Sequence, residues 1–205
     1  LKKVSKFFLH TFFLYLCAIM LRRLLIPVFA VAAFAFGESL TLALPDSLMA
    51  LSKKVTDQTM ALAYSDAIAT AKKLRAKNEQ AGCITESIVR ISMYDDRGDT
   101  AALVQAGRDL EKCKASGLWD ALRKFEIGYV QSETGHSVKG ALQTRSAAKM
   151  FDESEEQEAR AFYAIYAYYV DKSFSWVPFK SDHRKEYLAV LDSASKNSKR
   201  YWPLF

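Results

Sequence analysis

Residues 119–150, WDALRKFEIGYVQSETGHSVKGALQTRSAAKM, decide the fold class of this chain. Apolar and small side chains recur three or four positions apart on both sides of Gly135, which predicts two helices joined by a short turn. Glycine inside a helix costs roughly 0.5–1 kcal/mol relative to alanine, so Gly128 and Gly140 need a structural reason. We expect the two helices to pack closely at Gly128 and Gly140, with Gly135 in the turn.

The helical period of apolar residues continues along most of the chain after Pro45, with little alternation at period two. Helices are predicted over residues 57–77, 79–94, 100–115, 118–132, 137–150, 154–170 and 182–196. A shorter segment, 47–54, extends the first of these helices or packs beside it. Pairs of helices begin near residues 57, 99, 136 and 182. Because one pair cannot bury its own apolar face, this pattern predicts an all-α fold of stacked antiparallel helical hairpins.

The helix predicted over 154–170 has the clearest start in the sequence. Ser154 and Gln157 have the spacing of a capping box, and acidic residues surround them at the end of the helix where negative charge is favourable. The body of this helix, ARAFYAIYAYYV, is apolar or aromatic nearly all round. Such helices are usually buried on more than one side.

Residues 1–36 have the features of a signal peptide or membrane-anchor leader. Two arginines precede a 13-residue apolar run, and residues 33–35 form an Ala-x-Ala cleavage pattern. The run is shorter than the roughly 20 residues that cross a bilayer. Residues 1–19 repeat the basic-then-apolar plan, so translation could start at Leu1 or at Met20. Cleavage of the leader and its retention as an anchor both stay open.

The leader predicts export to a periplasmic or secreted location, with membrane contact only through this segment if it is uncleaved. Residues 37–205 then form one helical domain. The chain stops on residues 202–205, an apolar stretch without the polar cap that stacked hairpins need. A truncated C-terminus is therefore a further alternative.

The charge balance argues against nucleic-acid binding. The whole chain has 29 Lys and Arg against 23 Asp and Glu, but five of the basic residues and none of the acidic ones lie in residues 1–36. The remainder is nearly neutral, with 24 basic and 23 acidic residues. Binding to phosphates needs a clustered excess of cations, which residues 37–205 do not have.

The GHSVKG segment, residues 135–140, does not predict a catalytic site although it places His136 beside Ser137. Neighbouring side chains on a helix point about 100° apart, and no predicted strand precedes them, as a nucleophile elbow requires. The histidines and cysteines of residues 37–205 lack the spacing of metal ligands. We therefore expect no catalytic residues, no metal and no cofactor, in a protein that is not an enzyme.

Two cysteines stand at equal distances from a predicted turn. Cys83 lies 15 residues before Gly98 and Cys113 lies 15 residues after it, so an antiparallel hairpin would bring them to one level. Exported proteins can keep a disulfide. Cys113 lies on the apolar stripe of its predicted helix, whereas Cys83 lies about 100° from the centre of its own stripe. A disulfide and two separate buried thiols therefore both stay open.

Residues 119–150 resemble a tetratricopeptide repeat, in which a small residue lets the paired helix approach and a second glycine sits at the turn. Gly128 and Gly135 match these two positions, and Gly140 matches the small position of the second helix. The first helix has apolar residues of the right kind at Trp119, Leu122 and Phe125. The resemblance implies a TPR-like α-solenoid that binds a protein or peptide on its concave face.

Aromatic residues near the C-terminal end are the predicted partner-binding residues. Tyr163 and Tyr166 precede the segment SFSWVPF, which contributes Phe174, Trp176 and Phe179. Such side chains either pack into the core or anchor a partner, because Trp and Tyr dominate interface hot spots. We expect a protein-binding or scaffold module. The alternative is an extracytoplasmic solute-handling accessory that holds a small apolar ligand between helices, and an enzyme without a recognisable motif is a more distant one.

Overall fold

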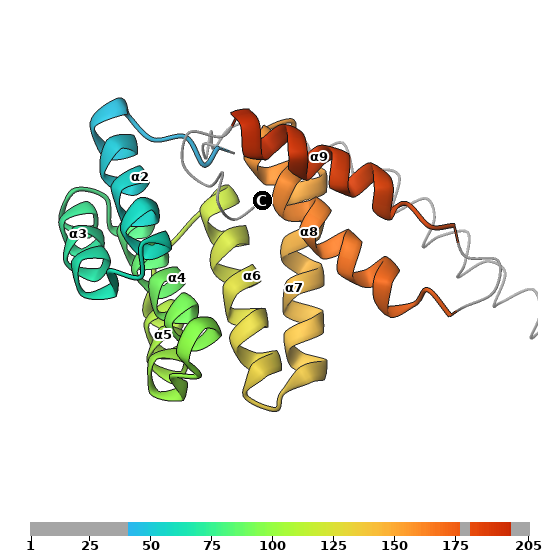
Figure 1. The fold of residues 1–205 in the computed structure, drawn as a ribbon, viewed down its shortest axis with the longest axis horizontal. Coiled ribbons are helices and arrows are strands. Elements are labelled where there is room, and N and C mark those ends of the chain that lie inside the picture. Colours follow the sequence, from blue (N-terminus) through green and yellow to red (C-terminus); the bar gives the residue numbers. More distant parts are fainter. Residues whose placement is uncertain (1–40, 177–180, 198–205) are drawn as a thin grey trace, which may run out of the picture. The chain divides into compact units, whose positions relative to one another are not determined.

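The computed structural model describes residues 41–176 and 181–197, and all regular secondary structure in these residues is helical (Figure 1). The eight helices of this part are α2 (Asp46–Met60), α3 (Tyr64–Lys77), α4 (Glu79–Arg97), α5 (Thr100–Lys112), α6 (Gly117–Glu133), α7 (Ser137–Asp152), α8 (Gln157–Ser173) and α9 (Arg184–Asn197). The predicted all-α class is confirmed. The predicted leader, residues 1–36, and the apolar end, residues 202–205, lie outside the described residues.

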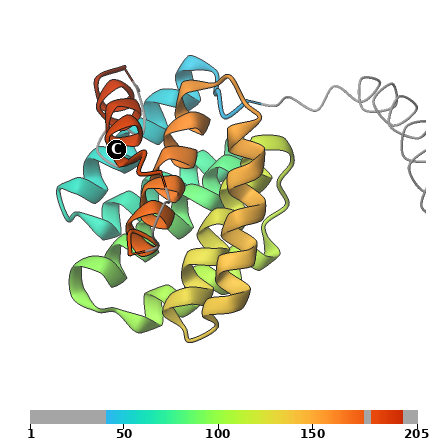
Figure 2. The ribbon, with the colours of Figure 1, turned by 90° about the vertical axis from the view of Figure 1, so that its right-hand side faces the viewer.

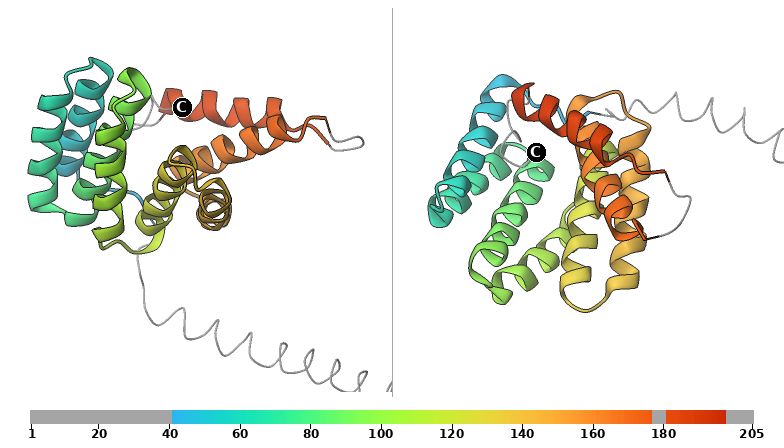
Figure 3. Two further views of the ribbon diagram at one scale, coloured as in Figure 1. Left: turned by 90° about the horizontal axis from the view of Figure 1, so that it is seen from below. Right: turned by 45° about the vertical axis from the view of Figure 1, so that its right-hand side comes forward.

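Each helix packs against the next one along the chain, and α4 also contacts both α2 and α6. In Figures 1 and 3 the ribbon passes from each helix to a neighbouring helix along the chain. These additional contacts of α4 group the helices into the pairs α2–α3, α4–α5, α6–α7 and α8–α9. In this grouping, the first helix of a pair contacts the first helix of the next pair. The pairs therefore begin at residues 46, 79, 117 and 157, not near the predicted 57, 99, 136 and 182.

The frame of pairs shifts because the helix predicted over 57–77 is two helices. The chain breaks at residues 61–63, where Leu62 has a φ of 58°. This left-handed conformation is uncommon for a residue with a β-carbon, and neither glycine nor proline marks the break. Met60 is consequently 55% exposed at the end of α2 and does not lie on the apolar stripe of α3.

The buried residues form two clusters. The larger cluster runs from Leu42 through α3, α4, α5, α6 and α7 to Phe162 of α8. The smaller cluster joins Val55 of α2, three residues of α3 and Val89 of α4. The second cluster explains the break at residues 61–63, because α2 must fold back for its apolar face to reach α4.

The start of α8 differs from its prediction. The helix begins at Gln157, with Glu156 at its N-cap and no side-chain capping bond. The predicted capping box is wrong, because the Ser154 hydroxyl accepts a hydrogen bond from the backbone N–H of Glu156 at 3.1 Å. The Glu156 carboxylate instead accepts from the backbone N–H of Leu42, at 2.8 Å. Leu42 is fully buried, so the chain that precedes α2 is fixed to the start of α8.

Candidate functional site

The most extensive helix packing in the described part of the chain occurs between α6 and α7, which run side by side in Figures 1 and 2. A β-carbon added at Gly128 of α6 would lie 2.8 Å from the carbonyl oxygen of Gly140 and 2.9 Å from the backbone nitrogen of Thr144. A β-carbon added at Gly140 of α7 would lie 2.9 Å from the backbone nitrogen of Ser132. Both glycines therefore allow contact between backbones.

The small polar residues beside these glycines form hydrogen bonds within their own helices. The Ser132 hydroxyl donates to the carbonyl oxygen of Gly128 and the Thr144 hydroxyl donates to that of Gly140, both at 2.9 Å. Each hydroxyl is thus satisfied within its own helix. Gly135 has a different role, because it lies in the turn with a φ of 89° and open space around it. Together these residues join α6 and α7 into one close pair.

A groove of about 1060 Å³ lies against this pair and is closed on its other side by α8. We call it the α6–α8 groove. Its lining residues are Phe125, Tyr129, Ser132, Ala141, Leu142, Thr144, Arg145, Ile165, Tyr166, Tyr169, Val170, Ser173 and Phe174. Most of them are apolar or aromatic, and Leu142 is 63%, Tyr169 59% and Phe174 49% exposed. Apolar side chains of this size in one concave surface are unusual unless a ligand or partner covers them.

Near its own start, α8 packs closely on the α6–α7 pair. Phe162 of α8 packs on Phe151 of α7 and Phe125 of α6, with ring centroids 5.5 and 6.1 Å away. Beyond Phe162, α8 runs obliquely away from the pair (Figures 1 and 3). The apolar residues in the second half of α8 therefore face the pair without being covered by it.

The predicted partner-binding residues divide into separate places. Tyr166 and Phe174 line the α6–α8 groove. Tyr163 instead packs against α9, with its ring centroid 6.3 Å from that of Tyr187. Trp176 is 77% exposed and is not part of the groove lining. Phe179 lies outside the described residues.

Several large lining residues were not among the predicted partner-binding residues, including Phe125, Tyr129, Leu142, Ile165 and Tyr169. A signal for one of them exists in the sequence of α7. Val138 and Leu142 are four residues apart and are 78% and 63% exposed, on the face opposite the buried Ala147 and Ala148. A second apolar stripe on a helix that already has a buried stripe indicates a surface for contact.

Two ionisable groups of α6 near the groove, Tyr129 and Glu126, have raised pKa values. The Tyr129 hydroxyl donates to Asp95 of α4. Burial first, and this hydrogen bond second, raise the pKa of Tyr129 well above its usual range. Burial also raises the pKa of Glu126, which follows Phe125 on α6, to about 8, and the negative charge of Asp95 adds to the shift. The groove therefore offers mainly apolar and aromatic surface, with Arg145 as the charged residue in its lining.

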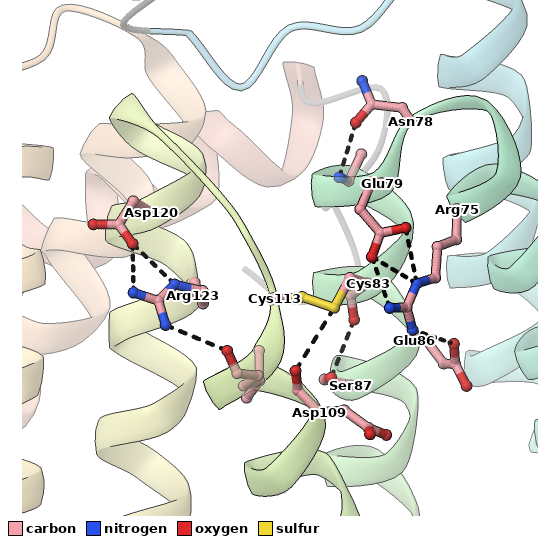
Figure 4. Close-up of a disulfide and its surroundings, with 12 residues drawn as sticks. Arg75, Asn78, Glu79, Cys83, Glu86, Ser87, Asp109, Cys113, Asp120 and Arg123 are labelled. Atoms are coloured by element: carbon pink, nitrogen blue, oxygen red, sulfur yellow. Dashed lines mark hydrogen bonds and ion pairs between the residues drawn. A yellow bond between two sulfur atoms is a disulfide. The ribbon is translucent and has the colours of Figure 1, made fainter.

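Cys83 and Cys113 form a disulfide, with their α-carbons 6.1 Å apart (Figure 4). Gly98, with a φ of 68°, ends α4, and the Asp99 carboxylate caps α5 by accepting from the backbone N–H of Ala102 at 2.9 Å. Cys113 is the first residue after α5 and is extended, although its helix was predicted to reach residue 115. Because Cys113 lies outside α5, the apolar stripe of that helix does not determine where the Cys113 side chain points.

A buried carboxylate beside the disulfide has a structural explanation. Glu86 of α4 is 6% exposed and lies 2.7 Å from the Arg90 guanidinium and 3.8 Å from that of Arg75 on α3. Arg90 also lies 3.6 Å from the carboxylate of Asp109 on α5. A buried charge needs such partners. These ion pairs connect α3, α4 and α5 and place Glu86 between two cations, of which Figure 4 shows Arg75.

The sequence also raised the questions of a catalytic His136–Ser137 pair, a metal site and a membrane-spanning helix. His136 and Ser137 are both exposed at the start of α7. Within residues 41–176 and 181–197, no three His, Cys, Asp or Glu side chains converge as metal ligands. In the same residues, no helix has both the length and the apolar character needed to cross a bilayer.

Comparison of the chain with protein-family models, with curated proteins and with solved structures finds no match in any of the three.

Proposed function

We propose that this protein is a TPR-like helical-repeat module that binds a segment of a protein or peptide in the α6–α8 groove. The observation that carries the proposal is the groove itself, which has a volume of about 1060 Å³. Five aromatic residues line it, from α6, from α8 and from the position directly after α8. Large aromatic side chains supply most of the binding energy at protein interfaces. The sequence of helix pairs and the glycine contact between α6 and α7 support the TPR-like assignment.

The lining favours a partner with apolar side chains. The exposed Leu142, Tyr169 and Phe174 can bury apolar surface on a partner, which stabilises a complex by roughly 25 cal/mol per Å². The volume lies at the upper end of the roughly 300–1,000 Å³ of small-molecule pockets, so several side chains of a peptide fit better than one compact ligand. We therefore propose a binding or scaffold role, without catalysis.

We also propose that the protein works in an oxidising compartment, as a periplasmic or secreted protein. The disulfide between Cys83 and Cys113 supports this location, because disulfides persist in such compartments and are rare in the cytosol. Mass spectrometry of non-reduced peptides from the cell fraction that contains the protein tests it. Two alkylatable thiols in that fraction would contradict it.

Photocrosslinking from inside the groove tests the binding function. We place p-benzoyl-phenylalanine at Leu142, in the groove, and in a matched variant at Leu188 of α9, which is 50% exposed outside the groove. Illumination in cells should give a discrete protein adduct from position 142 and not from position 188. The same adducts from both positions, or none from position 142, would show that the groove is not a protein-binding site.

A further inference from the structure

A second cavity, of about 140 Å³, lies between α2, α3 and α4 and shares no residue with the α6–α8 groove. We call it the α2–α4 pocket. Its apolar walls come from all three helices and include Val55, Tyr64, Ile88 and Val89. None of its lining residues carries a charge at neutral pH. A charged ligand would therefore lose its hydration without gaining a partner, which excludes it.

Five hydroxyl groups stand among these apolar walls, and four of them have partners. Thr56 and Thr59 donate to carbonyl oxygens of α2, at 3.3 and 2.8 Å, and Ser92 donates to that of Ile88 at 3.1 Å. The Tyr64 hydroxyl donates to the carbonyl oxygen of Ser92 at 3.4 Å. The Thr85 hydroxyl differs, because it is buried without a hydrogen-bond partner in the described part of the chain. Thr85 is only 4% exposed.

An unpaired buried hydroxyl destabilises a fold unless a ligand group satisfies it. A serine or threonine inside a helix normally donates to the carbonyl oxygen four residues earlier, as Thr56, Thr59 and Ser92 do. Thr85 lines the pocket, and its hydroxyl has no competing partner in the described part of the chain. The pocket thus combines an apolar enclosure with one hydroxyl group that lacks a partner, and a few polar groups among apolar walls are the usual composition of a small-molecule site.

We propose that the α2–α4 pocket binds a small neutral molecule of about one six-membered ring, with one hydroxyl or carbonyl group that hydrogen-bonds to Thr85. The size follows from the volume, since an apolar protein cavity of about 150 Å³ accommodates benzene. The neutrality follows from the uncharged lining. The polar group follows from the free hydroxyl of Thr85.

The rim of the pocket gives access to this site. Met60 and Leu62 line the pocket and are 55% and 53% exposed at the turn between α2 and α3. The turn is held to the end of α4, because Arg97 donates to the Leu62 carbonyl oxygen at 3.4 Å and lies 4.6 Å from the Tyr64 ring centroid. The unbranched Met60 side chain can adjust its position without moving this turn.

Ligand-observed fluorine NMR of the full chain tests the proposal with 3-fluorophenol and 3-fluorotoluene, which have similar shapes but differ in the hydroxyl group. The wild type should bind 3-fluorophenol more tightly. Thr85→Val removes the hydroxyl at similar volume and should weaken 3-fluorophenol binding about threefold to tenfold, the factor for one neutral hydrogen bond. Binding of 3-fluorotoluene should not change.

Three control variants make the outcome decisive. Thr70→Val makes the same change at a threonine of α3 that is 6% exposed and outside the pocket, so it should leave both affinities unchanged. Ser92→Leu fills the pocket and should abolish binding of both probes. Tyr169→Ala, in the α6–α8 groove, should leave both affinities unchanged. The proposal is overturned by equal binding of the two probes, by unchanged 3-fluorophenol affinity in Thr85→Val, by no binding at millimolar concentration, or by loss of binding in Tyr169→Ala.

Discussion

At the residue scale, Gly128 and Gly140 determine how closely two helix backbones approach. A β-carbon at either position would meet backbone atoms of the facing helix, which cannot rotate away as a flexible side chain does. The small side chain of Thr144, with the hydroxyl turned back to Gly140, suits a position directly opposite Gly128.

Substitution at Gly128 therefore tests the contact. Gly128→Ala should lower the free energy of unfolding by about 1–3 kcal/mol, the usual cost of overpacking, despite the higher helix propensity of alanine. Gly135→Asn is the comparison at the turn, where the added side chain has open space but a φ of 89° strains any residue with a β-carbon. Asparagine tolerates such a conformation better than most residues, so this variant should cost less than Gly128→Ala, about 1 kcal/mol or below. Urea unfolding measures both, and a stabilising Gly128→Ala would contradict the close contact.

The Glu126 carboxyl should make stability depend on pH. Its pKa is about 8 in the folded protein and 4.5 in an unfolded chain, so the folded state binds more protons between these values. The free energy of unfolding should consequently fall as pH rises from 4.5 to 8. Glu126→Gln should remove this part of the slope and stabilise the protein at the alkaline end. Urea unfolding of wild type and variant across this range measures it, and parallel curves would contradict the burial of this carboxyl.

At the element scale, the hairpin of α4 and α5 is closed twice, by the turn at Gly98 and Asp99 and by the disulfide. In the chain-entropy model, a loop of 30 residues gains roughly 3.5 kcal/mol from such a bond. The double variant Cys83→Ala and Cys113→Ala should therefore lose about 2–4 kcal/mol.

Thermal unfolding with and without a reducing agent checks this value. The reductant should lower the Tm of the wild type toward that of the double variant and leave the double variant unchanged. A wild-type Tm that does not respond to complete reduction would contradict a stabilising role for the bond.

Most helices could be predicted from the sequence because their signals are local. The turn at Gly98 and Asp99 has a glycine in the left-handed region and a capping carboxylate, and both are visible as residue types. The break at residues 61–63 could not be predicted, because its cause is the packing of α2 and α3 on Val89 of α4. The start of α8 was predicted at the wrong residue for a similar reason, because the Glu156 carboxylate forms a hydrogen bond with the distant backbone N–H of Leu42.

At the scale of the whole molecule, the one missed break moved every predicted helix pair by one helix. Only two of the five aromatic residues in the candidate site were open to prediction. Tyr166 and Phe174 belong to an obvious aromatic segment, but the course of α8 is set by the contact of Phe162 with Phe125 and Phe151. That three-helix contact decides which aromatic residues are buried, and no local pattern records it.

The most direct measurement of the central claim is the yield of the photocrosslinked adduct from position 142 in two further variants. Tyr169→Ala removes an exposed aromatic residue of the groove, and Trp176→Ala removes an exposed aromatic residue outside its lining. If the groove holds the partner, Tyr169→Ala should reduce the yield at least tenfold, as loss of a hot spot does, while Trp176→Ala keeps it. An adduct that survives Tyr169→Ala at full yield, in protein with unchanged Tm, would contradict binding in the groove.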